Sequence, residues 1–228
     1  MDAQQIKHRL KELGADLCGI AGIDRFEQAP KGVHPTDVLP TCQSVIVFAK
    51  RFLAGTLACN TTIPYTIVRN ILSDQMDQMA VQFCTELENR GILAIPTGTN
   101  GPTEYSEETK RYRNIVSAKH AAVAAGLGTI GKNTLLITPQ YGNMVWLSVI
   151  LTELKLEADP LIDVPCCDNC NRCVDVCPSH ALEEEQMEQV ACWESAFGSE
   201  GKGEWRIKCF RCREVCPYHF GEHNKVLL

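Results

Sequence analysis

The feature that most constrains this chain is a cluster of cysteines in its last third. Of the 13 cysteines among its 228 residues, nine lie between Cys166 and Cys216. Two motifs occur there, C-x2-C-x2-C-x3-C-P starting at Cys167 and C-x2-C-x3-C-P starting at Cys209. Small disulfide-stabilised domains usually have fewer than about 80 residues, so a chain of this length does not need a disulfide scaffold. The clustering indicates metal or redox chemistry instead.

The rest of the sequence carries no sign of export or membrane insertion. Residues 1–14 form an amphipathic helical pattern, with Ile6, Leu10 and Leu13 on one face, and they contain no apolar signal-peptide core. There is no run of about 18 apolar residues, which argues against a transmembrane span. We therefore predict a cytoplasmic protein without a membrane partner. The 22 basic and 28 acidic residues give a net charge of −6, which is not typical of a general nucleic-acid-binding protein.

The cysteine spacing predicts two [4Fe–4S] clusters. A tight C-x2-C-x2-C loop supplies three thiolates to one cluster, and in bacterial two-cluster ferredoxins the fourth cysteine of such a run binds the other cluster. We call the predicted ligands of the first cluster the first set and those of the second cluster the second set. The first set is Cys167, Cys170, Cys173 and Cys216, and the second set is Cys177, Cys192, Cys209 and Cys212.

Other interpretations of the cysteines remain open at this point. Two structural zinc sites would also use four thiolates each, although zinc ribbons usually carry two separated C-x2-C pairs. Cys166 is left over, either as a neighbour of the first set or as a replacement for Cys167 in it. The four remaining cysteines show no metal-binding spacing, and we expect them to be small buried hydrophobic residues. These are Cys18, Cys42, Cys59 and Cys84.

A change of composition near residues 159–165 divides the chain, and we predict one domain over residues 1–160 and another over 161–228. Helical and strand patterns alternate in the first part, which predicts an α/β or α+β layered domain. The alternation does not choose between a parallel and an antiparallel sheet. We expect helices over residues 65–90 and 114–125, and strands over residues 16–23, 44–49, 92–95, 133–138 and 144–152.

The segment Ser117–Gly142, which contains AGLGxxGKNxLL, resembles the signature of the epoxyqueuosine reductase family. The LGADLCGIAG and SVIVFA segments and the complete cysteine pattern, including Cys192, extend the resemblance over most of the chain. The same superfamily contains the reductive dehalogenases. The resemblance implies a nitroreductase-like, cobalamin-binding domain followed by a ferredoxin-like domain with two [4Fe–4S] clusters. It also implies a base-off corrinoid close to the first cluster.

The G-x-G-x-x-G pattern from Gly126 to Gly131 follows a predicted helix and opens a strand, which disfavours a dinucleotide-binding Rossmann motif. Glycines let the backbone approach a flat ring or a phosphate, and Lys132 and Asn133 would bind a nucleotide tail. A glycine helix stop beside a surface lysine is the structural alternative. The corrinoid-binding residues that the resemblance implies are Lys119, His120, Gly126, Leu127, Gly128, Gly131, Lys132, Asn133 and Thr134.

The sequence departs from the epoxyqueuosine reductase pattern at the proton donor. Those enzymes carry an acidic residue in a V-D-S-x-P segment, whereas residues 111–116 here read RYRNIV and contain no carboxylate. Because the dehalogenases use a tyrosine, the resemblance implies Tyr105 or Tyr112 as the catalytic donor. The alternative is that both are loop aromatics. We expect the nearby glutamates Glu104, Glu107 and Glu108 to form a solvated face.

These observations lead to three functional hypotheses. The first is a corrinoid-dependent reductase, or a corrinoid reductase or activator, that receives electrons from reduced ferredoxin, flavodoxin or another low-potential donor. Electrons would pass through the second cluster and then the first to cobalt in a corrinoid or corrinoid protein. The second is a minimal epoxyqueuosine reductase-like tRNA-modifying enzyme, and the third an electron-transfer protein without its own substrate. The end of the sequence at Leu228 and the negative charge argue against tRNA as a partner.

Overall fold

A four-stranded antiparallel sheet forms the centre of the computed structural model, which describes residues 1–182, 187–199 and 201–222. The sheet order is β1–β2–β8–β3, and each strand pairs antiparallel with its neighbours. The alternation of helices and strands in the sequence left this choice open. The strands are β1 (Leu17–Gly22), β2 (Ser44–Arg51), β8 (Val145–Thr152) and β3 (Ala94–Pro96).

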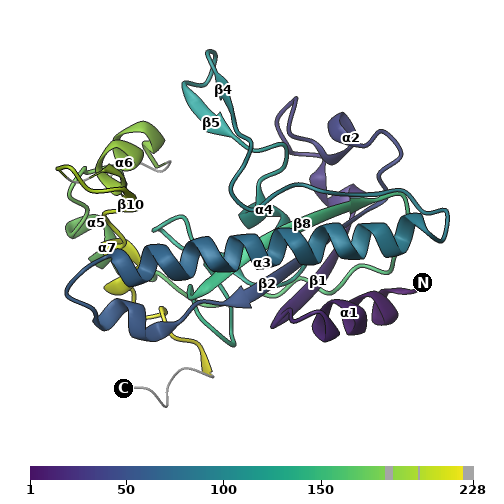
Figure 1. Cartoon of the computed structure of the whole chain (residues 1–228), viewed down its shortest axis with the longest axis horizontal. Coiled ribbons are helices and arrows are strands. Elements are labelled where there is room, and N and C mark those ends of the chain that lie inside the picture. The colour runs from purple at the N-terminus through teal and green to yellow at the C-terminus, as the bar shows by residue number, and fades with distance from the viewer. Residues whose placement is uncertain (183–186, 200, 223–228) are drawn as a thin grey trace.

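Helices cover both faces of the sheet (Figure 1). Side chains alternate between the two faces of a strand, so Ile46 and Phe48 of β2 pack against α1 (Ala3–Glu12) and α3 (Ile63–Glu88). Val45 and Val47 point to the other face and pack against α4 (Ala118–Ala124). The central strand is therefore buried on both sides, and the site described below forms at one end of this layered body.

The long helix α3 confirms the sequence prediction for residues 65–90, with ends shifted by two residues. The apolar residues spaced along its face, among them Met76, Phe83 and Leu87, are fully buried in the core beneath the sheet. After its last turn, Gly91 adopts a φ of 74°, a left-handed conformation that glycine adopts without strain. In the described part of the chain, no helix is both long and apolar enough to span a membrane.

Short elements connect and extend the sheet. The predicted strand 133–138 is reduced to two residues, because Thr134 adopts a left-handed φ of 59° that interrupts extended backbone. The short elements outside the four-stranded sheet are η1 (Ile23–Phe26), α2 (Pro35–Val38), η2 (Ala54–Ala58), the hairpin β4 (Glu104–Ser106) and β5 (Arg111–Arg113), and the pair β6 (Thr129–Ile130) and β7 (Leu136–Ile137).

The cysteine-rich segment packs against the beginning of α3 and the turn after β7. The ring of Phe210 stacks on Tyr65 at a centroid distance of 4.5 Å. A Cβ on Gly142 would lie 2.1 Å from the carbonyl oxygen of Tyr218, so the two backbones touch where no side chain fits. The segment contains α5 (Arg172–Asp175), α6 (Gln189–Ala196), β9 (Phe197–Ser199), β10 (Trp205–Ile207) and α7 (Arg211–Glu214).

Removing a large core side chain from α3 is expected to destabilise this body. We expect Phe83→Ala to lower the free energy of unfolding by about 3–5 kcal/mol, because it removes a fully buried ring and leaves a cavity. Val81→Ala, at a position on the same helix that is 54% exposed, is the matched control and should cost far less. Urea denaturation followed by circular dichroism measures both values. Equal losses would show that this face of α3 does not form the core.

Candidate functional site

The four cysteines of the first set lie around one small hollow, which Asn133 and Tyr218 also line. Cys173 comes from α5, and Cys216 follows α7. Burial raises the pKa of the Cys216 thiol, and the neighbouring thiols of Cys167, Cys173 and Cys170 raise it further. The structure therefore brings together thiols from two separate motifs, as the spacing predicted.

Backbone geometry around Cys167 suits a loop that wraps a compact group. Cys167 and Asn169 adopt left-handed φ values of 67° and 53°, which turn the chain tightly. The backbone N–H of Lys132 donates to the Cys167 sulfur at 3.3 Å, and hydrogen bonds of this kind tune the reduction potentials of iron–sulfur clusters. A Cβ on Gly131 would lie 3.4 Å from that sulfur. The end of the glycine signature thus packs against the first set.

The second set is gathered by α6, α7 and the turn after α5. Burial raises the pKa of Cys192, and Cys177 and Cys209 raise it further. Burial also raises the pKa of Cys212 to about 12, with added contributions from Cys209 and Cys192. Cys192 thus interacts electrostatically with each of the other three thiols of the set. The residues of both sets thus fit two thiolate-bound groups.

The spacing of the thiols bears on the zinc alternative. Tetrahedral zinc with bonds of about 2.3 Å draws its thiolates to within about 4 Å of each other. Among the described residues, no three Cys, His, Asp or Glu side chains converge in the way one metal ion requires. A four-iron cube spreads its thiolates more widely, since each binds a separate iron. The preference for clusters over zinc therefore rests on the cysteine spacing in the sequence, C-x2-C-x2-C-x3-C-P.

The four upstream cysteines take different positions. Cys42 and Cys84 are buried and Cys18 is half-buried, and burial raises the pKa of Cys18 and of Cys84 to about 12. Cys59 is exposed, so the prediction that it is a buried hydrophobic residue is wrong. It lies at the end of η2, where its thiol donates to the carbonyl oxygen of Gly55 at 3.4 Å.

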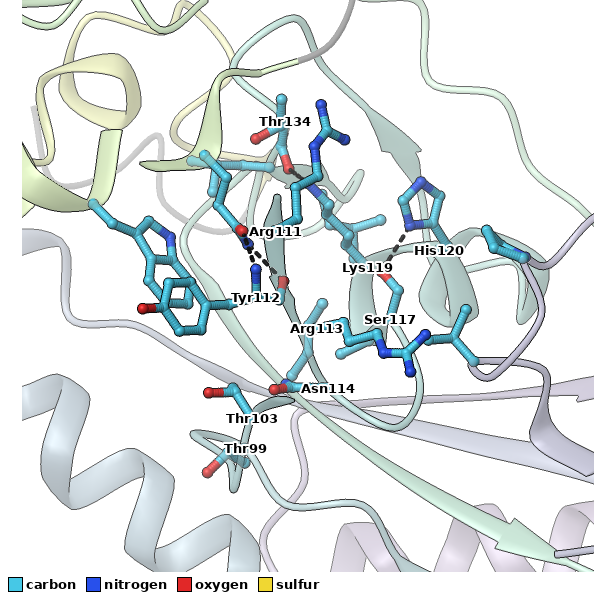
Figure 2. A pocket seen from close by; sticks show the side chains of 18 of the residues that line it. Thr99, Thr103, Arg111, Tyr112, Arg113, Asn114, Ser117, Lys119, His120 and Thr134 are labelled. Carbon is cyan, nitrogen blue, oxygen red and sulfur yellow. Dashed lines mark hydrogen bonds between the residues drawn. The ribbon is translucent and has the colours of Figure 1, made fainter. Parts of the chain in front are cut away.

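A cavity of about 930 Å³ lies between β8, the first turn of α4, the β4–β5 hairpin and α6 (Figure 2). Apolar side chains from the sheet side, Leu136, Val145 and Leu147, line one part of it. Basic side chains, including Lys31 and Arg113, line another, and Glu108 is the one carboxylate among its described lining residues. The cavity is large, partly apolar and positively charged, as a site for a sizeable ligand with anionic groups would be.

Three of the nine corrinoid-binding residues implied by the resemblance line this cavity: Lys119, His120 and Thr134. The Lys119 Nζ donates to the Thr134 carbonyl oxygen at 3.0 Å, and Nδ1 of His120 lies 2.7 Å from the Ser117 hydroxyl (Figure 2). Burial lowers the pKa of Lys119, and the charge of Arg111 lowers it further. Burial and the charge of Lys119 also lower the pKa of His120, which favours a neutral imidazole at pH 7.

The other six residues of that group lie outside the described lining of the cavity. Gly126 and Gly128 approach the chain's own backbone: a Cβ would lie 2.2 Å from the Pro160 carbonyl oxygen and 2.1 Å from that of Ile137, respectively. Asn133 is buried and donates from Nδ2 to the carbonyl oxygen of Cys212 at 3.1 Å. These six residues are Gly126, Leu127, Gly128, Gly131, Lys132 and Asn133.

Of the two candidate tyrosines, Tyr112 lines the cavity and Tyr105 does not. The Tyr112 ring stacks on Trp193 of α6 with centroids 4.9 Å apart, and it lies across its strand from Lys119 and His120 in Figure 2. Its backbone N–H donates to Oε1 of Gln189 at 2.7 Å, and its carbonyl accepts from Nε2 at 2.9 Å. The hairpin is thus held against the cysteine-rich segment.

The sequence did not point to several residues of the cavity. Asn143 is buried and lines it, and both polar atoms of its side chain lack a hydrogen-bond partner in the described part of the chain. Arg213, which is 5% exposed, also lines it and donates from Nη1 to the Asn143 carbonyl oxygen. Neither residue belongs to a recognisable pattern. Only the position of Arg213, directly after a predicted ligand, could have drawn attention to it.

The cavity borders the second cysteine set. Trp193 and Arg213 line it and directly follow Cys192 and Cys212 in the sequence, whereas none of the residues 166–182 line it. Lys119 on the cavity wall interacts electrostatically with Cys192. The expectation that a corrinoid lies close to the first set stays a prediction: Asn133 lines the hollow of that set, and the next residue, Thr134, lines the cavity. The first set also borders a separate hollow of about 630 Å³, which Asp168 and Asp175 line.

Comparison with known proteins identifies relatives of the chain among the epoxyqueuosine reductases. No protein-family model matches the chain. An epoxyqueuosine reductase from Gloeobacter violaceus is 38% identical over 215 residues, covering 80% of this chain and 61% of that protein. The chain thus spans about three fifths of this relative's length.

Solved structures extend the comparison to the fold. The epoxyqueuosine reductase from Streptococcus thermophilus matches with a TM-score of 0.64 at 21% identity, covering 96% of this chain and 66% of that one. A catabolic reductive dehalogenase matches with a TM-score of 0.70 at 19% identity, covering 95% of this chain and 32% of that one. The chain is thus similar in sequence to the epoxyqueuosine reductases, and it shares its fold with them and with a reductive dehalogenase.

Proposed function

We propose that the chain is an iron–sulfur, corrinoid-dependent oxidoreductase that reduces epoxyqueuosine in tRNA to queuosine. The observation that carries this proposal is the cavity of about 930 Å³, which has a basic lining and includes the residues that follow Cys192 and Cys212 in the sequence. The similarity to named epoxyqueuosine reductases supports this substrate over the reduction of a corrinoid as an end in itself.

The cavity residues fit a corrinoid. The apolar wall of Leu136, Val145 and Leu147 suits a flat macrocycle. The amide of Asn143, which has no hydrogen-bond partner among the described residues, suits the amide groups at the edge of such a ring. Lys119 would bind an anionic group of the ligand. When bound, a corrinoid supplies a low-potential cobalt centre that can reduce a carbon–oxygen bond.

The chain's own residues would hold the clusters, define the electron path to the cavity and supply a proton. The eight cysteines of the two sets would hold the clusters, and a low-potential ferredoxin, flavodoxin or similar protein would donate the electrons. We infer that they enter at the first set, beside the outer hollow, and leave from the second set toward the cavity. Conversion of the epoxide to an alkene takes up two electrons and two protons and releases water. Tyr112, which lines the cavity, is our candidate for holding one of these protons at its hydroxyl.

The interpretation that tRNA is not a partner is not supported by the relatives. One solved epoxyqueuosine reductase is described in a complex with an epoxyqueuosine-modified tRNA stem-loop. In this chain, Lys31, Arg111 and Arg113 gather at the cavity although the net charge is −6. Basic groups beside exposed aromatic rings are typical of single-stranded nucleic-acid sites. We propose that they bind phosphates on either side of the modified nucleoside.

A second candidate is a corrinoid reductase or activator, in which the electrons end on the corrinoid itself. It is favoured by the absence of a carboxylate from residues 111–116, where epoxyqueuosine reductases carry their acid. One experiment separates the two. The anaerobically reconstituted protein is given cobalamin, a chemical reductant and an epoxyqueuosine-containing tRNA stem-loop, and the nucleosides are analysed by mass spectrometry. Formation of queuosine supports the first function. Reduced cobalamin with unchanged epoxyqueuosine supports the second.

Filling the cavity should prevent corrinoid binding without disturbing the clusters. We expect Ala118→Trp, at the first turn of α4, to weaken cobalamin binding by about tenfold to a hundredfold, because overpacking costs about 1–3 kcal/mol. Ala58→Trp, at an exposed position of η2, is the matched control. Titration followed by absorbance measures the affinity, and iron analysis checks the clusters. Unchanged binding by Ala118→Trp would place the corrinoid elsewhere.

A further inference from the structure

Asn133 belongs to the glycine signature, yet it lies outside the described lining of the corrinoid cavity. It is 4% exposed, and it lines the small hollow that the four cysteines of the first set surround. Its Nδ2 donates to the carbonyl oxygen of Cys212, a member of the second set, at 3.1 Å. One buried side chain therefore contacts the segments that carry both cysteine sets, and the corrinoid cavity does not account for it.

Asn133 lies where the two cysteine sets come together. Cys173 belongs to α5 and Cys212 to α7, and these two short helices pack against each other. Asn133 shares the first-set hollow with Cys173 and is hydrogen-bonded to the main chain at Cys212. An electron that passes from one cluster to the other would cross this junction. The contact thus lies on the path that the proposed function requires.

The turn that carries Asn133 is closed by its own hydrogen bonds. The Thr134 N–H donates to the Gly131 carbonyl oxygen at 2.8 Å, and the Gly131 N–H donates to the Leu135 carbonyl oxygen at 3.0 Å. Oδ1 of Asn133 accepts from the Leu135 N–H at 3.2 Å, which forms an Asx turn. A Cβ on Gly131 would lie 3.1 Å from that oxygen, so the glycine leaves room for the amide. The turn uses Oδ1, and Nδ2 is the atom that reaches Cys212.

The same turn is attached to the first cysteine set. The backbone N–H of Lys132 donates to the Cys167 sulfur at 3.3 Å, and Nζ of Lys132 donates to Oδ1 of Asn171 at 2.8 Å. Asn171 lies between two predicted ligands of the first cluster. The turn therefore has a fixed position relative to the first set, and the hydrogen bond from Asn133 to Cys212 joins the second set to it.

We propose that Asn133 is a positioning residue that holds the second cysteine set at a fixed distance from the first, and so sets the rate of electron transfer between the two clusters. The proposal rests on the proposed function, because it requires both clusters. In each transfer one cluster is oxidised and the other is reduced by one electron, and no bond is broken. Because the rate of electron transfer falls steeply with distance, a small displacement of α7 slows it.

Other contacts hold α7 on the body of the protein, so variants at Asn133 should still fold. Arg213 donates to the Asn143 carbonyl oxygen, and Phe210 stacks on Tyr65. These contacts attach α7 to the start of β8 and to α3, and not to the first set. Loss of the Asn133 amide should therefore change how closely the two sets approach while both clusters assemble.

Electron paramagnetic resonance of the full reconstituted chain, reduced chemically without corrinoid, tests the proposal. When both clusters are reduced, their magnetic interaction splits the spectrum, and the splitting falls steeply with the distance between them. Asn133→Leu removes both hydrogen bonds of the amide at similar size. Asn133→Ser keeps an oxygen for the Leu135 N–H, but its side chain is too short to reach Cys212. Both variants should keep about eight iron atoms per chain and lose the splitting.

Asn70→Ala removes an exposed amide of α3 and is the matched control, which should give the wild-type spectrum. If Asn133→Ser keeps the wild-type splitting, Asn133 serves only its own turn, and the proposal is overturned. Unchanged splitting in Asn133→Leu would overturn it as well, and so would two reduced wild-type clusters that do not interact. Loss of one cluster from both variants would show a role in assembly instead of distance. A wild-type protein that takes up no iron would overturn the proposed function itself.

Discussion

Cys192→Ser is expected to lower the iron content from about eight to about four atoms per chain, because each [4Fe–4S] cluster requires its complete thiolate set. Cys192 lies apart from both C-P motifs, yet its thiol lies close to Cys177 and Cys209. It also borders the cavity through Trp193. We therefore expect Cys192→Ser to abolish reduction in the cavity, since the second set is the one whose neighbouring residues Trp193 and Arg213 line it. Iron and sulfide analysis measures the loss.

Two matched variants make this result specific. Cys216→Ser should also leave about four iron atoms, but in the second-set cluster, so the resonance spectra of the two variants should differ. Cys166→Ser changes the cysteine next to Cys167 and should keep the full iron content. If Cys166→Ser loses iron while Cys167→Ser does not, Cys166 is the ligand. A Cys192→Ser protein that keeps all its iron would contradict the assignment of the second set.

Tyr112→Phe is expected to lower the turnover number by about a hundredfold or more, because a positioned general acid contributes about 10²–10⁴-fold. Phenylalanine keeps the ring that stacks on Trp193 and the backbone hydrogen bonds to Gln189. The hairpin should therefore stay in place, with KM, iron content and cobalamin binding unchanged. The measurement is the steady-state rate of queuosine formation.

Tyr105→Phe is the matched control for this prediction. Tyr105 faces Tyr112 across the hairpin at a centroid distance of 5.0 Å but does not line the cavity. It should keep a turnover number near that of the wild type. If Tyr112→Phe turns over as fast as the wild type, Tyr112 only packs on Trp193. Glu108, the carboxylate among the described lining residues, would then be the next candidate for the proton donor.

Much of the site could be predicted because it depends on local spacing. The C-x2-C-x2-C loop closes on itself within a few residues, so its geometry is fixed by the backbone near Cys167. The crossing of Cys216 to that loop follows from the same constraint, and the structure places the two side by side. Helix α3 was predictable for a similar reason, since its apolar face repeats at the helical period.

The remaining features of the fold and of the site depend on contacts between segments that are distant in the sequence, and no local sequence pattern encodes such contacts. The glycines of the signature were expected to face a ligand, but Gly126 and Gly128 accommodate the backbone of residues 160 and 137. The order β1–β2–β8–β3 joins strands separated by long stretches of chain. Arg213 and Asn143 meet across 70 positions of sequence. The position of each cysteine set relative to the cavity follows from that packing.

Metal analysis of anaerobically reconstituted wild-type protein, after incubation with cobalamin and removal of the excess, tests the central claim most directly. We predict about eight iron atoms per chain from two four-iron clusters, no zinc, and one cobalt with a base-off absorbance spectrum. Zinc in place of iron would contradict the cluster assignment. Full iron without cobalt would show that the cavity beside the second set does not hold a corrinoid.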